Sequence, residues 1–251
     1  MRAGAVLTAG QLQERQPGEG VLPVLPSLKT LFPAGGLARG SVVAVDRYGL
    51  LCLALIAAAS AAGAWCGAAG VPELGVVAAA QAGAEPDQLL LVPDPGPAWA
   101  RVAATLIEGC EIVIMRPPEQ PSLRSRQRLE AVLRQSSGVL LVIGEWHGAA
   151  ARLRVTRQHW TGLGDGHGRL QACRAEVIAE GRGAAARPRS QWLWLPGPDG
   201  SVTDAGPGQA MPGLPARVHR VAGRALRQAG QDPETESTPV REASPSAICG
   251  S

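Results

Sequence analysis

Apolar strand segments alternate with helical segments between residues 41 and 143, and this alternation constrains the fold of the 251-residue chain more than any other feature. The strand segments lack strict apolar–polar alternation, as is typical of strands buried on both faces. They are 41–45, 88–92, 111–115 and 139–143. Helices are expected at 50–65, 99–108 and 123–135, and the segment 76–80 fits either a strand or a helix. The pattern predicts an α/β fold with a largely parallel sheet and helices on both faces.

The pattern changes in the C-terminal part of the chain. Residues 169–178 and 191–195 alternate apolar and polar side chains with period 2, and a turn rich in Gly and Arg separates them. These segments predict a β-hairpin that extends the sheet. The sequence after residue 195 predicts a Pro/Gly-rich linker, one short basic helix at 215–229 and a disordered tail. We therefore expect a flexible N-terminus at 1–20, a core at 21–200 and a flexible C-terminal region at 201–251.

The turn after the first predicted strand lacks the residues of a phosphate-binding loop. In the motif G-x-x-x-x-G-K-[ST], the lysine contacts the β- and γ-phosphates and the hydroxyl holds magnesium. Here the strand runs into Asp46-Arg47-Tyr48-Gly49 and then directly into an apolar run that begins at Leu50. The single lysine, Lys29, lies before the strand and cannot substitute. We therefore expect no cofactor and no enzymatic activity.

Composition and charge argue against several other classes of protein. The five cysteines show no C-x-x-C spacing and the four histidines no metal-ligand spacing, so neither a zinc site nor a disulfide framework is expected. A net charge of +3 permits contact with nucleic acid without demanding it. The uncharged stretch between Arg47 and Glu73 is mostly Ala and Gly and follows a strand, which favours a buried helix over a membrane span. No secretory signal is visible, so we expect a cytoplasmic protein without membrane contact.

The order of elements resembles the RecA core and, more closely, the short RecA-like proteins of the ImuA type in their actinobacterial form. The segments that carry the resemblance are 31–43, 91–99, 162–170 and 192–196. It implies a RecA-like three-layer α/β core with a degenerate nucleotide site, a C-terminal β-hairpin extension and a flexible C-terminal tail. It also implies a non-catalytic accessory protein of SOS-induced mutagenic translesion DNA synthesis. Such proteins act with ImuB, an inactive Y-family polymerase homologue, and with an error-prone C-family DNA polymerase; RecA is a further candidate partner.

The resemblance also exposes a second missing element of a nucleotide site. RecA-type ATPases end an apolar strand with an acidic residue that handles magnesium, whereas residues 112–114 lead here to Met115 and Arg116. Glu145 falls near the place where RecA keeps a polar residue that senses the γ-phosphate. Without the lysine and the magnesium ligands, a solvated strand end is the simpler interpretation of Glu145.

The stretch from Trp146 to Arg169 occupies the place of a DNA-binding loop in RecA. Its candidate DNA-binding residues are Arg152, Arg154, Arg157, Trp160 and Arg169. Guanidinium groups pair with phosphates and indoles stack on bases, so this set suits single-stranded DNA. The alternative is a solvated basic loop whose tryptophans fold back onto the core.

The predicted helix at 215–229 places apolar residues roughly on one side and arginines on the other, which suits binding in a partner's groove. The candidate partner-binding residues are Arg217, Val218, Arg220, Val221, Arg224, Leu226 and Arg227. The resemblance favours this interpretation, because the C-terminal part of ImuA-like proteins is implicated in contact with ImuB. The alternative is a helix that caps the chain's own core, or a solvated tail.

Two other functions remain open at this point. The first is a SulA-like inhibitor of cell division, which is also RecA-shaped and lacks a phosphate loop. The second is an active recombinase-like ATPase, against which the single lysine argues directly.

Overall fold

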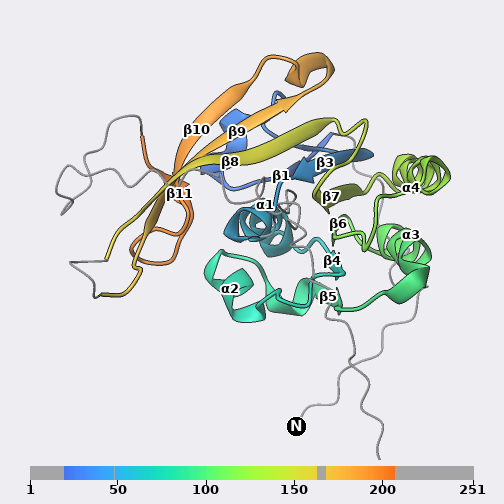
Figure 1. Ribbon diagram of the computed structural model, residues 1–251, viewed down its shortest axis with the longest axis horizontal. Coiled ribbons are helices and arrows are strands. Elements are labelled where there is room, and N and C mark those ends of the chain that lie inside the picture. The colour runs from blue at the N-terminus through green and yellow to red at the C-terminus, as the bar shows by residue number, and fades with distance from the viewer. Residues whose placement is uncertain (1–19, 48, 163–167, 207–251) are drawn as a thin grey trace, which may run out of the picture. The chain divides into compact units, whose positions relative to one another are not determined.

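The computed structural model describes residues 20–47, 49–162 and 168–206, which form a nine-stranded mixed sheet with helices on two faces (Figure 1). The strand order is β11-β10-β9-β8-β3-β7-β6-β4-β5. The six strands from β8 to β5 pair in parallel, and those from β8 to β11 pair antiparallel. The parallel strands are β3 (Ser41–Val45), β4 (Cys66–Ala69), β5 (Leu89–Val92), β6 (Ile112–Met115), β7 (Val139–Ile143) and β8 (Ala151–Trp160).

The helices divide between the two faces of the parallel strands. One face carries α1 (Leu50–Ala61) and α2 (Val76–Gln81), and the other carries α3 (Trp99–Gly109) and α4 (Leu123–Ser136), as Figure 1 shows. Alternate residues of each strand reach opposite faces. Ile112 and Ile114 join the cluster beneath α1, whereas Val113 joins the cluster beneath α3 and α4. Burial on both faces explains the continuous apolar strands and confirms the expected RecA-like three-layer core.

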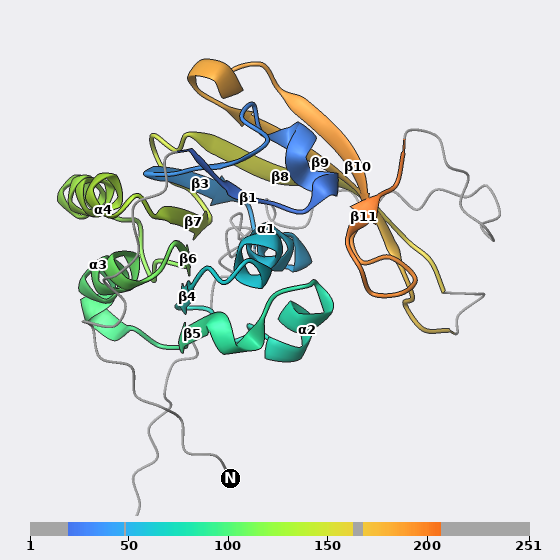
Figure 2. The same cartoon turned by 180° about the vertical axis from the view of Figure 1, so that it is seen from behind.

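The predicted C-terminal hairpin is also confirmed. It consists of β9 (Cys173–Gly181) and β10 (Arg189–Trp194), joined by a turn that contains the short helix η5 (Gly183–Ala185). Its apolar side packs towards α1 and towards the short helix η2 (Pro26–Leu31). This helix connects β1 (Val21–Pro23) and β2 (Gly36–Ala38), which form a small two-stranded sheet. In Figure 2, which shows the molecule from behind, the blue helix η2 lies against the hairpin. The two remaining short helices are η3 (Pro86–Gln88) and η4 (Gly96–Ala98).

Three expectations need correction. The stretch after residue 146 is not a loop throughout, because residues 151–160 form β8. The expected helix at 50–65 ends at Ala61, and Cys66–Ala69 is a strand that the sequence did not predict. The described part of the predicted linker, up to residue 206, folds back onto the hairpin. Its strand β11 (Thr203–Asp204) pairs with β10, and Val202 and Ala205 are buried. The ambiguous segment at 76–80 is helical.

Among the helices that the structure describes, none is long and apolar enough to cross a bilayer. The expectations for the first 19 residues, for 163–167 and for everything beyond 206 lie outside the described residues.

Candidate functional site

The turn between β3 and α1 occupies the position of a phosphate-binding loop but has different chemistry. Only the four residues 46–49 separate Val45 from Leu50, and Tyr48 among them lies outside the described residues. The backbone N–H of Asp46 donates to the carbonyl oxygen of Leu153 at 3.2 Å, so it points to β8. Cys52, in the first turn of α1, is fully buried. The turn contains no Lys, Ser or Thr to hold a phosphate or a magnesium ion.

Asp46 places a carboxyl group at this end of the sheet. Burial raises its pKa above the ordinary value, and the charges of Arg154, Arg152 and Arg47 oppose that shift. Glu145 adds a second carboxylate nearby and raises the pKa of Asp46 a little further. Two carboxyl groups repel a triphosphate at the place where an ATPase supplies positive charge.

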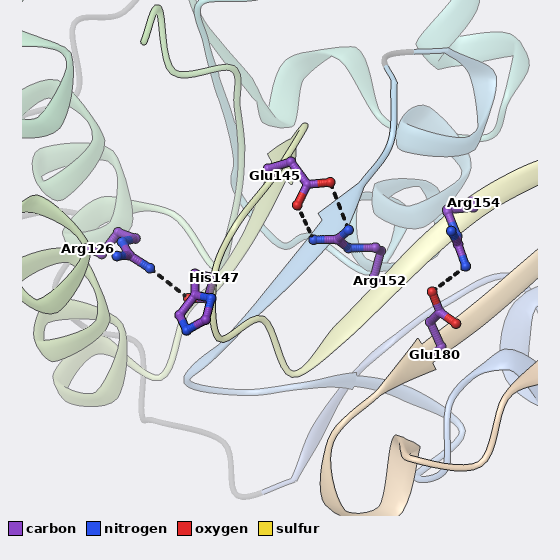
Figure 3. Close-up of polar contacts among 6 residues, drawn as sticks. All are labelled: Arg126, Glu145, His147, Arg152, Arg154 and Glu180. Carbon is purple, nitrogen blue, oxygen red and sulfur yellow. Dashed lines mark hydrogen bonds and ion pairs between the residues drawn. The ribbon is translucent and has the colours of Figure 1, made fainter. Parts of the chain in front are cut away.

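Two of the three arginines that act on Asp46, Arg152 and Arg154, are already held by carboxylates (Figure 3). Arg152 donates two hydrogen bonds to Glu145, at 2.8 and 2.6 Å, which raise the pKa of the guanidinium. Arg154 pairs with Glu180 on the neighbouring strand β9. A phosphate group that approached these arginines would therefore compete with two existing ion pairs.

The structure brings the three predicted DNA-binding arginines of β8 onto one face. Arg152, Arg154 and Arg157 lie opposite Glu180, Ile178 and Glu176, which are alternate residues of β9. A register shift between Val155 and Arg157 keeps the third arginine on the same face, although its spacing breaks the period of 2. The intervening Leu153 is fully buried in the core. Arg157 also has a carboxylate partner, since its Nε lies 3.5 Å from an oxygen of Glu176.

The two tryptophans of this stretch have different environments. Trp146 is only 1% exposed, and its Nε1 donates to the Glu130 carboxylate at 3.1 Å. Its indole therefore packs onto the core and is not accessible for stacking on a nucleic-acid base. Trp160, at the end of β8, is 41% exposed. Arg169 is exposed just after the residues that the structure does not describe. The alternative interpretation, in which tryptophans fold back onto the core, therefore holds for Trp146.

A further aromatic cluster lies on the same outer face of the sheet, and sequence reasoning did not assign it a role. The guanidinium carbon of Arg174 lies 4.5 Å from the ring centroid of Trp192, and the His159 ring stacks on the same indole at 6.0 Å. The period-2 alternation of 191–195 indicates that one pair of alternate side chains packs inward, and the structure shows that this pair is Leu193 and Leu195.

A hollow of about 870 Å³ opens beside the ion pairs of Glu145 and Glu180, between the β6–α4 loop, the β7–β8 loop and the β9–β10 turn. Among the described residues, no group of three or more His, Cys, Asp or Glu side chains is placed to bind a metal ion. The predicted partner-binding residues, Arg217, Val218, Arg220, Val221, Arg224, Leu226 and Arg227, lie outside the described residues.

Comparison with known proteins places the chain among its relatives. The family model described as the MT3502 N-terminal domain matches residues 30–148. The uncharacterized protein Rv3395c of Mycobacterium tuberculosis is 31% identical over 163 residues, which cover 61% of this chain and 80% of that protein. With this coverage the chain belongs to the family of the MT3502 N-terminal domain and Rv3395c.

Proposed function

We propose that the chain is a non-catalytic RecA-like adaptor of mutagenic translesion DNA synthesis that binds an ImuB-like inactive Y-family polymerase homologue. The observation that carries the proposal is the turn between β3 and α1, which keeps the position of a phosphate loop and none of its ligands. A relative from Mycobacterium is consistent with the actinobacterial form of the ImuA type.

The electrostatics of the site support the absence of ATP chemistry. Phosphoryl transfer depends on positioned cations that neutralise the charge developing on the phosphate oxygens. Here Asp46 and Glu145 add carboxyl groups, and the nearby Arg152 is already paired. Binding of Mg²⁺–ATP would have to break that ion pair without gaining a lysine or a magnesium hydroxyl.

An adaptor needs surfaces for its partners. The proposal assigns contact with the ImuB-like protein to the segment Arg217–Arg227, on the apolar–basic pattern of its sequence. It assigns single-stranded DNA to the outer face of β8, where Arg154 and Arg157 are partly exposed. Trp160 pairs with the buried Cys173 of β9, so its side chain lies on the other face of the strand, at its exposed end. The error-prone C-family polymerase and RecA are further candidate partners, which the resemblance alone supports.

The adaptor function is tested by pull-down with the full-length chain as bait and two separate prey proteins. We expect capture of the ImuB-like protein and none of the tubulin-like division protein that a SulA-like inhibitor would bind. The triple change Val218→Asp, Val221→Asp and Leu226→Asp should abolish the capture. A second variant, with Arg217 and Arg224 changed to Gln, should mainly slow association in a salt-sensitive way. If the bait captures only the division protein, the adaptor function is wrong and the chain is a SulA-like inhibitor of cell division.

Absence of ATP binding is tested separately by calorimetric titration with Mg²⁺–ATP. We expect no micromolar binding and no turnover above a mock preparation from cells without the gene. Saturable binding that depends on magnesium would overturn the non-catalytic assignment.

A further inference from the structure

We propose that the hollow between the β6–α4 loop, the β7–β8 loop and the β9–β10 turn binds a phosphate group, held by the guanidinium groups of Arg126 and Arg182. Both arginines line the hollow. The site is distinct from the β3–α1 turn, and the inference does not depend on the adaptor function.

Arg126 reaches the hollow from the first turns of α4. Its Nη1 donates to the carbonyl oxygen of His147 at 3.3 Å, which directs the side chain at the β7–β8 loop (Figure 3). Its Nε is shielded from solvent and has no hydrogen-bond partner among the described residues. A buried donor without a partner costs free energy, and an anion in the hollow would remove that cost.

Arg182 reaches the same loop from the opposite side. It follows β9, and its backbone N–H donates to the carbonyl oxygen of Ala150 at 3.2 Å. Its Nη2 lies so close to Gly148 that a Cβ added there would be 2.6 Å away, and Gly148 has a positive φ of 93°. The guanidinium groups of Arg126 and Arg182 therefore contact consecutive residues, His147 and Gly148, of one loop.

The two arginines differ from their neighbours because no carboxylate is within ion-pair distance of them in the part of the chain that the structure describes. The carboxylates that line the hollow are already used, Glu145 by Arg152 and Glu180 by Arg154. The hollow thus carries two positive charges that internal acids do not neutralise.

The chemistry of this pair selects a phosphate group. Guanidinium groups present planar N–H donors that match the oxygens of a phosphate and remain charged at any physiological pH. A hollow of about 870 Å³ is within the size range of ligand sites and exceeds a lone phosphate. The phosphate is therefore either the end of a phosphorylated small molecule or one unit of a nucleic-acid backbone.

The test uses the full chain at low ionic strength with two probes, inorganic pyrophosphate by calorimetry and a fluorescent oligothymidylate by anisotropy. The double variant Arg126→Gln and Arg182→Gln should weaken binding of at least one probe about tenfold or more. The matched control carries Arg124→Gln and Arg128→Gln, two exposed positions on the same helix with the same change in charge. The control should stay within about twofold of the wild type, and all three proteins should melt alike.

The two probes identify the source of the phosphate. Loss of pyrophosphate binding alone indicates a phosphorylated small molecule, and loss of oligonucleotide binding alone indicates a backbone phosphate. Loss of both, with pyrophosphate competing against the oligonucleotide, also indicates the backbone. The proposal is wrong if the wild type binds neither probe, or if the control variant loses as much affinity as the double variant.

Discussion

Replacing Trp146 by alanine is expected to destabilise the folded unit by about 4 kcal/mol. The indole is 1% exposed and packs in the cluster beneath α3 and α4. An aromatic side chain buries about 150–250 Å², which at about 25 cal/mol per Å² corresponds to about 4–6 kcal/mol. Measured costs of Trp→Ala changes in protein cores are about 3–5 kcal/mol. For a unit of this size, about 4 kcal/mol corresponds to a Tm lower by about 8–16 °C.

Trp160 provides the matched control, because it lies on the same stretch of chain and is 41% exposed. Trp160→Ala should lower the Tm by less than half as much as Trp146→Ala. If Trp160 stacks on a base, its loss should weaken binding of single-stranded DNA by about 1–3 kcal/mol. Thermal unfolding by circular dichroism and oligonucleotide anisotropy measure the two effects separately. Equal melting losses for the two variants, or an unchanged Tm for Trp146→Ala, would refute the assignment of Trp146 to the core.

Other predictions concern ion pairs, ionisation and the end of the core. Glu180→Gln should release Arg154, steepening the log–log salt dependence of single-stranded DNA binding by roughly 0.7; an unchanged slope in a KCl series would show that Arg154 does not face DNA. Burial raises the pKa of Cys52 from 9.0 to about 12, so only the unfolded chain ionises it between those values. Its contribution to stability is therefore complete below pH 9 and declines above it by up to about 1.4 kcal/mol per pH unit. Urea unfolding should show a shallower decline for Cys52→Ala, and parallel curves would contradict this. Deletion of 201–251 should melt at a lower temperature than deletion of 207–251, because only the former removes the segment that returns to β10; equal melting would mean that this segment adds nothing.

The parallel core was predictable because strands that are buried on both faces consist of continuous runs of apolar residues in the sequence. The strand β4 escaped prediction because Cys66–Ala69 contains only Cys, Gly and Ala, which have little preference for strands. A Cβ on Gly67 would lie 3.4 Å from side-chain atoms of Cys110 and Leu106, which is ordinary van der Waals contact, so these side chains pack directly over the strand. Contacts between distant segments decide such a strand, and the local sequence does not contain them.

The strand β8 escaped prediction for a different reason. Arginines at 152 and 154 fit a strand with one exposed face, but the register shift moves the next one to 157 and breaks the alternation. Without regular alternation, residues 151–160 were interpreted from the sequence as part of a basic loop. The partners of these arginines were equally hidden, because Glu180 lies 26 residues from Arg154 in the sequence. The structure places three of the candidate arginines on one face of β8, whereas the sequence alone did not show that carboxylates neutralise them.

That neutralisation distinguishes two basic surfaces that the sequence shows as one. Arg152 keeps Glu145 engaged beside Asp46, so an anion that captured Arg152 would leave two carboxyl groups close together without their cation. Arg126 and Arg182 have no carboxylate partner among the described residues, so an anion can bind them without breaking an ion pair. An anion in the hollow should therefore settle on Arg126 and Arg182 and leave the pair of Arg152 and Glu145 intact. It follows that Glu→Gln changes on β9 and Arg→Gln changes in the hollow should alter anion binding independently, since they act on different cations.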